Sequence, residues 1–145
     1  LCVGIAQVQA TDASRKLAHS AVIIPPHIAA PGELMAAWRD RATGAAPPAL
    51  PVVLDVRGAW ELQTASVTPG GFRLLHIPMR DVPARLAELE ETYGTAHPIA
   101  CLCHHGMRSL QVGNFLEQRG FTEVVNLQGG IDAWSHQVDA GVPRY

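Results

Sequence analysis

The chain has 145 residues, of which 48% are hydrophobic and 17% are charged, and its formal net charge is −2 at pH 7. A chain of this length and composition can form one domain with a buried core, and it is too apolar to be disordered throughout. The near-neutral charge gives no electrostatic reason to expect binding to nucleic acid or to an anionic membrane. No apolar run approaches the length of about 20 residues that a membrane-spanning helix requires.

Three cysteines are present, Cys2, Cys101 and Cys103. They are too few and too clustered for a disulfide framework, and Cys101 and Cys103 are poorly placed to pair with each other along an extended strand. The first residues carry no basic region ahead of their short apolar stretch, so a signal peptide is not expected. We therefore expect reduced thiols and a cytoplasmic protein.

The N-terminal part of the chain is weakly patterned. Residues 1–20 are polar and rich in small residues, and we expect them to form a loosely attached arm. Residues 27–29 are expected to form an edge strand, and Pro31 then begins a helix that ends at Gly44. A segment typical of a linker follows at residues 43–51.

Beyond the linker, short apolar runs alternate with helical patterns. Continuous apolar runs of this kind are typical of strands that are covered on both faces. The predicted strands are residues 52–56 (VVLDV), 73–77 (RLLHI), 98–103 (PIACLC) and 123–127 (EVVNL).

Three helical patterns accompany these strands. They are residues 81–94, with Leu86, Leu89 and Tyr93 on one face; residues 107–120, with Val112, Phe115 and Leu116 on one face and Gly120 as the stop; and a turn into a last helix at 129–138. Strands that alternate with helices indicate parallel βαβ units, so the sequence predicts an α/β domain with helices on both faces of the sheet. Function in such sheets gathers beyond the carboxyl ends of the strands.

The segment CHHGMRS, residues 103–109, joins one of these strands to a helix that begins near Met107 or Arg108. Gly106 supplies the backbone freedom for so short a reversal. A tight strand-to-helix loop turns backbone N–H groups inward and makes an anion site, in which a cysteine thiolate is stabilised. Arg108 places a positive charge in the first turn of the helix, where acidic residues are usual, and this indicates an anion nearby.

Cys103 could be a nucleophile, a buried core thiol or a metal ligand, and its place at a strand end before a glycine loop favours the nucleophile. Cys101 lies deeper on the same side of the strand and is expected to be a core thiol, although it could act as a resolving thiol if the strand end moved. His104 and His105 are expected to point in divergent directions and to shape the rim of the site. No second ligand pair lies at a fitting spacing, so we expect no metal and no other cofactor.

Five segments together resemble the rhodanese (thiosulfate sulfurtransferase) family, in the family's order and from about Ile28 to the end of the sequence. They are LDVRGAWE (54–61), HIPM (76–79), CHHGMRS (103–109), GF..V.NL.GG (120–130) and IDAW (131–134). The resemblance implies a doubly wound, five-stranded parallel sheet, with residues 1–20 as an arm and 21–145 as the domain. Gly58 and Ala59 stand where relatives often have Glu-Pro, which we interpret as a change of loop stiffness with little bearing on chemistry.

The resemblance also implies a persulfide mechanism with Cys103 as the catalytic nucleophile. The thiolate attacks the outer sulfur of thiosulfate, sulfite leaves, and the persulfide passes its sulfur to cyanide or a thiol. The loop N–H groups would hold the terminal sulfur while Arg108 attracts the anionic donor. The residues expected to contact substrate are His104, His105, Gly106, Met107, Arg108 and Ser109.

Five further side chains are expected to have structural roles. The resemblance implies that Asp55 and Arg57, which project to one side of a strand end, hold neighbouring loops together. Trp134 is expected in the core, in a segment that the family places beside the mouth of the site. Trp60, like Trp38, is expected to be a helix-packing residue.

The implied partners are a small-molecule sulfur donor and a thiol or cyanide acceptor, and a protein thiol could also accept sulfur. We expect no nucleic-acid or membrane partner, and a monomer or weak dimer.

One alternative function is a non-catalytic rhodanese-like module that binds a partner or carries sulfur, although such modules commonly lack the cysteine. A phosphatase or arsenate reductase of the cell-cycle phosphatase type shares the fold but resembles C-x5-R. Here Cys103 and Arg108 form C-x4-R, a smaller loop that fits sulfur better than phosphate or arsenate.

Overall fold

The structure, a computed structural model, describes residues 27–42 and 49–145. The predicted N-terminal arm, the predicted end of the first helix at Gly44 and most of the predicted linker lie outside the described residues.

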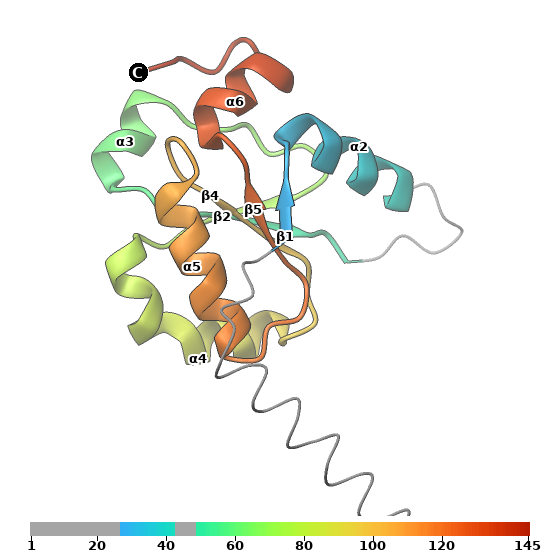
Figure 1. Cartoon of the computed structure of the whole chain (residues 1–145), viewed down its shortest axis with the longest axis vertical. Coiled ribbons are helices and arrows are strands. Elements are labelled where there is room, and N and C mark those ends of the chain that lie inside the picture. Colours follow the sequence, from blue (N-terminus) through green and yellow to red (C-terminus); the bar gives the residue numbers. More distant parts are fainter. Residues whose placement is uncertain (1–26, 43–48) are drawn as a thin grey trace, which may run out of the picture.

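Five parallel strands form one sheet in the order β1-β5-β4-β2-β3 (Figure 1). The strands are β1 His27–Ala29, β2 Val52–Asp55, β3 Arg73–His76, β4 Ile99–Leu102 and β5 Val124–Leu127. Every residue of β2 and β4 is buried, as expected of apolar strands covered on both faces. The predicted α/β fold with a five-stranded parallel sheet is therefore confirmed, and β1 is the edge strand that completes it.

Helices cover both faces of this sheet (Figure 1). They are α2 Pro31–Ala42, α3 Ala59–Thr64, α4 Val82–Tyr93, α5 Met107–Gln118 and α6 Gly130–Gln137, with a 3₁₀ turn at Met79–Asp81. On one face, Trp38 of α2 and Trp134 of α6 pack around Phe72, with ring centroids 6.3 and 5.6 Å away. On the other face, α4 and α5 bury Leu89 and Leu116.

The helix faces expected from the apolar spacing are confirmed, because all six predicted residues of α4 and α5 belong to the second of these core layers. Trp38 and Trp134 are core residues, as predicted. The sequence patterns did not include α3, since a helix of six residues is too short to show a hydrophobic period. No helix in the described part of the chain has the length and apolar character needed to cross a membrane.

The sheet order determines where a site can form. The chain leaves β2 toward β3 and leaves β4 toward β5, which lie on opposite sides of the β2–β4 pair. The carboxyl ends of β2 and β4 therefore meet at a topological switch point, where open α/β sheets bind their ligands. Arg57 follows β2 closely and Cys103 follows β4 directly, so these two residues lie at that point.

Candidate active site

Cys103 lies at the bottom of the loop that joins β4 to α5, and only 1% of its surface is exposed. Gly106 precedes α5 with φ of 105°, in the left-handed region that favours glycine. A Cβ atom at Gly106 would lie 3.2 Å from the backbone nitrogen of Gly129. The tight reversal predicted from the sequence is therefore present, and both its conformation and its packing require glycine.

The N-terminus of α6 supports this loop from behind. The Ile131 N–H donates to the Cys103 carbonyl at 2.8 Å, and the Asp132 N–H donates to the His104 carbonyl at 3.3 Å. A Cβ atom at Gly130 would collide with these same two carbonyl oxygens. Because a trans peptide places the C=O and the next N–H on opposite sides, the N–H groups of His104 and His105 point away from α6.

Two donors face the sulfur of Cys103. The Gly106 N–H lies 3.0 Å from Sγ, and the Ser109 hydroxyl lies 3.2 Å from Sγ. Ser109 is fully buried, and its hydroxyl also lies 2.6 Å from Oδ1 of Asn126 on the neighbouring strand β5. Hydrogen bonds to sulfur favour the thiolate, so the arrangement fits a nucleophile.

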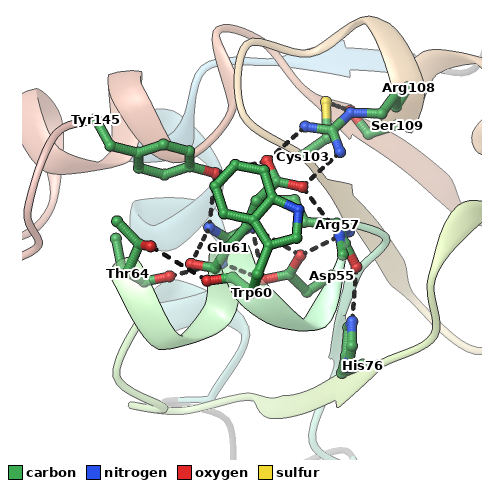
Figure 2. A network of polar contacts seen from close by, with 12 residues as sticks. Asp55, Arg57, Trp60, Glu61, Thr64, His76, Cys103, Arg108, Ser109 and Tyr145 are labelled. Carbon is green, nitrogen blue, oxygen red and sulfur yellow. Dashed lines mark hydrogen bonds and ion pairs between the residues drawn. The ribbon is translucent and has the colours of Figure 1, made fainter.

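Arg108 lies in the first turn of α5, next to this loop, and its guanidinium group forms an ion pair with Glu61 of α3 (Figure 2). The two terminal nitrogens of Arg108 donate to the two oxygens of Glu61 at 2.7 and 2.8 Å. Glu61 also accepts from the Gly58 N–H and from the Tyr145 hydroxyl, both at 2.9 Å. The hydrogen bonds from Arg108 lower the pKa of Glu61 to about 2, although burial opposes this. The charge of Arg108 is thus matched by a carboxylate.

Asp55 and Arg57 form a buried ion pair at the end of β2. The Arg57 Nε and Nη2 atoms donate to Asp55 Oδ1 and Oδ2 at 2.9 and 2.7 Å. The remaining donors of Arg57 bind the Glu61 and Ala65 carbonyls and the Tyr145 hydroxyl. Burial lowers the pKa of Arg57, but its bonds to Asp55 and Tyr145 outweigh burial and raise it. Arg57 therefore links β2, the middle and the C-terminal end of α3, and Tyr145, which is the linking role that the resemblance implied.

Tyr145 and the two histidines form a stack of rings at the mouth of the site. The His104 ring lies between Tyr145, at 3.9 Å with planes 9° apart, and His105, at 3.8 Å with planes 28° apart. The expectation that the two histidines diverge is therefore wrong. It assumed an extended chain, whereas the tight loop brings successive side chains to one side. The buried Nε2 atom of His104 has no hydrogen-bond partner among the described residues.

Two large apolar side chains are exposed at this end of the molecule. Trp60 is 65% exposed and Met107 is 69% exposed, at the starts of α3 and α5. The expectation that Trp60 is a helix-packing residue is wrong, because α3 buries Glu61 instead and turns Trp60 outward, where its ring forms a T-shaped pair with Tyr145 at 6.3 Å.

Cys101 lies on β4, two residues before Cys103, and is fully buried. Burial, with smaller contributions from Cys103 and Glu117, raises the pKa of Cys101 to about 12. This thiol therefore stays protonated at neutral pH, as a core thiol does. Within residues 27–42 and 49–145, no three His, Cys, Asp or Glu side chains come together in a way that could hold a metal ion.

The sequence analysis missed three polar residues of the site: Glu61, Asn126 and Tyr145. Glu61 stands three residues after Gly58, which is the spacing of a helix capping box and a signal for α3. Asn126 interrupts an apolar strand, and a buried polar residue at such a place indicates a specific partner. Tyr145 carries no local signal, because its partners lie 84 and 88 residues away.

The fold and the loop place this chain among doubly wound α/β proteins that present a cysteine at the switch point of the sheet. The chain belongs to the rhodanese family, because the model of the rhodanese-like domain matches residues 36–137.

Individual relatives agree with this assignment. The chain is 33% identical over 92 residues to thiosulfate sulfurtransferase GlpE of Actinobacillus succinogenes, covering 63% of this chain and 73% of that protein. It is 34% identical over 93 residues to the chloroplastic rhodanese-like/PpiC domain-containing protein 12 of Arabidopsis thaliana, but this match covers 64% of the chain and only 30% of that protein. A rhodanese-like domain protein from Staphylococcus aureus shares the fold, with a TM-score of 0.58 and 24% identity over 82% of this chain and 98% of that one.

Proposed function

We propose that this protein transfers sulfane sulfur from thiosulfate or a related donor to a thiophilic acceptor through a persulfide on Cys103. The observation that carries the proposal is the environment of the sulfur, which receives the Gly106 N–H and the Ser109 hydroxyl in a buried loop. Membership of the rhodanese family and similarity to a protein named thiosulfate sulfurtransferase support the same chemistry.

The reaction has two displacement steps. The Cys103 thiolate attacks the outer sulfur of thiosulfate, an S–S bond forms, and the bond to the sulfonate sulfur breaks so that sulfite leaves with the electron pair. The acceptor, cyanide or a thiolate, then attacks the outer sulfur, and the Cys103 thiolate leaves. The donors on Sγ stabilise the negative charge that returns to this atom in the second step.

Arg108 supports the donor side of the reaction in this proposal. Its charge lies within reach of the loop, since the cysteine and the arginine interact electrostatically, and about a third of its side chain is exposed. Because Glu61 engages both terminal nitrogens, the attraction for an anionic donor is moderate. The same pairing argues against a phosphatase, which needs a guanidinium free to bind an oxyanion.

A protein thiol is a suitable acceptor in addition to small molecules. Trp60 and Met107 are exposed and lie in the first turns of α3 and α5. The ion pair between Glu61 and Arg108 connects these two helices. Aromatic residues and methionine are enriched where proteins bind each other. We also propose a cytoplasmic location, because Cys101 and Cys103 are both free thiols.

The proposal is tested by steady-state turnover. Wild type should form thiocyanate from thiosulfate and cyanide with ping-pong kinetics, and Cys103→Ser should show no activity above the uncatalysed rate. Hydrolysis of p-nitrophenyl phosphate, assayed in parallel, should be absent. Phosphatase activity without thiocyanate formation would refute the proposal, and equal thiocyanate formation by Cys103→Ser would remove Cys103 from the mechanism.

A further inference from the structure

The Ser109 hydroxyl group has one hydrogen atom but two acceptors. Its oxygen lies 2.6 Å from Asn126 Oδ1 and 3.2 Å from Cys103 Sγ. The Asn126 amide cannot turn over to donate instead, because its Nδ2 atom already donates to the Gly106 carbonyl at 3.2 Å. Asn126 therefore presents only an acceptor to Ser109, and it competes with the sulfur for a single hydrogen.

The outcome of this competition depends on the state of the sulfur. When Cys103 is a neutral thiol, its S–H can donate to Ser109, whose hydrogen then goes to Asn126, and every group is satisfied. When Cys103 is a thiolate, the sulfur has no hydrogen and is the stronger acceptor, so Ser109 turns to it and Asn126 Oδ1 loses its partner. In a persulfide the Sγ atom is an uncharged bridging sulfur, and the hydrogen can return to Asn126.

Burial makes this exchange costly enough to matter. Cys103, Ser109 and Asn126 are all at least 95% buried, so water does not readily replace a lost hydrogen bond. The thiolate therefore forms at the expense of the Ser109–Asn126 bond. A thiolate that is less stabilised is a stronger nucleophile.

We propose that Asn126 is a positioning residue that sets the direction of the Ser109 hydroxyl: it holds the hydrogen while the sulfur is a thiol or a persulfide, and it yields the hydrogen to the thiolate. The thiol and thiolate part of this inference follows from the geometry alone, and only the persulfide part rests on the proposed function. In the second step of sulfur transfer, Cys103 Sγ is the leaving atom. The Ser109 hydroxyl then donates its hydrogen bond to Sγ as negative charge returns to this atom.

Other ionisable groups surround Cys103, and they are unchanged in variants of Asn126. They are Cys101 on β4, His104 and His105 in the loop, Arg108 with Glu61 across α5 and α3, Arg57 with Asp55 beyond β2, and Tyr145. The difference between wild type and the uncharged variant Asn126→Ala therefore reports the hydrogen of Ser109 rather than the general field of the site.

The experiment measures the rate of Cys103 alkylation by iodoacetamide against pH, quantified by mass spectrometry of the Cys103 peptide. Asn126→Ala should lower the midpoint of this profile by about 0.5 to 1 pH unit, because Ser109 is then free to donate to the thiolate. Ser109→Ala should raise the midpoint by a similar amount. In the double variant the midpoint should match that of Ser109→Ala alone, since Asn126 acts only through Ser109.

A structural role for Asn126 predicts a different pattern. If Asn126→Ala raises the midpoint, or shifts it equally with Ser109 absent, the inference is overturned. The Gly106 carbonyl keeps a second donor in Asn126→Ala, because the Leu110 N–H lies 3.2 Å from it. Asn126→Asp is the second variant: its carboxylate holds the hydrogen more tightly and its charge also opposes a negative charge on Sγ, so the midpoint should rise, and a fall would contradict the proposal. Alkylation needs no sulfur transfer, so failure of the proposed function shows separately in the turnover assay.

Discussion

Replacement of Glu61 by Gln removes the carboxylate that joins α3 to α5 and to Tyr145. Arg108 then loses its ionic partner, while Gln keeps the size of the side chain and one carbonyl oxygen. A pKa that falls from 4.5 to about 2 corresponds to about 3 kcal/mol of stabilisation, since one pKa unit is about 1.4 kcal/mol. Because 36% of the Arg108 side chain is exposed and solvent screens the pair, we expect a loss of about 2 kcal/mol.

The pH dependence follows from the direction of this pKa change. The folded-state pKa of Glu61 lies below its unfolded value, so the stabilisation is fully present above about pH 4.5 and disappears as the pH falls toward 2. Urea unfolding followed by circular dichroism should therefore show a gap between wild type and Glu61→Gln that is constant from pH 5 to 7 and narrows below pH 4.

A matched control is the exposed pair of Arg85 and Glu88 on α4, which also forms two hydrogen bonds. Glu88→Gln removes the same charge from a solvent-exposed place and should leave the urea midpoint unchanged at every pH. If Glu61→Gln is as stable as Glu88→Gln at pH 7, or if its gap to wild type does not narrow in acid, the reasoning about the Glu61–Arg108 pair is refuted.

Three further substitutions test the site. Arg108→Ala should raise the KM for thiosulfate about fivefold and leave kcat little changed. Arg119→Ala, at the exposed far end of α5, is the control and should leave this KM unchanged. If Arg108→Ala also leaves the KM unchanged, the role of Arg108 is limited to its contact with Glu61. Cys101→Ser should keep most of kcat/KM in the thiocyanate assay, and loss of turnover in a folded variant would instead make Cys101 a resolving thiol. Gly130→Ala should unfold at much lower urea than wild type, because its Cβ meets two carbonyl oxygens. Gly94→Ala, whose φ of 80° and ψ of 168° favour glycine but whose Cβ would meet open space, should lose only about 1 to 3 kcal/mol, and equal losses in the two variants would contradict the packing argument.

The fold was predictable because its signals are local. The apolar runs at Val52–Asp55 and Ile99–Leu102 determine buried parallel strands, and the spacing in α4 and α5 determines which faces are covered. The loop after β4 was predictable for the same reason, since Cys103 and Gly106 are only three residues apart.

The contacts made by side chains in the site were not predictable. Glu61 and Arg108 are 47 residues apart, and nothing in either segment shows that they pair. The sequence predicts that Arg108 lies beside an anion site. Only the position of α3 shows that the carboxylate of Glu61 already binds its guanidinium group. Trp60 was misplaced for a related reason: the short helix α3 buries its polar residue, against the rule that apolar side chains face inward.

The central claim is that Cys103 carries the sulfur, and intact-mass measurement tests it most directly. After incubation with thiosulfate and removal of excess reagent, wild type should gain the mass of one sulfur atom, and addition of cyanide should remove it. Cys101→Ser should gain the same mass, and Cys103→Ser should gain none. Wild-type protein that stays unmodified, or Cys103→Ser protein that takes up sulfur as wild type does, would contradict the account.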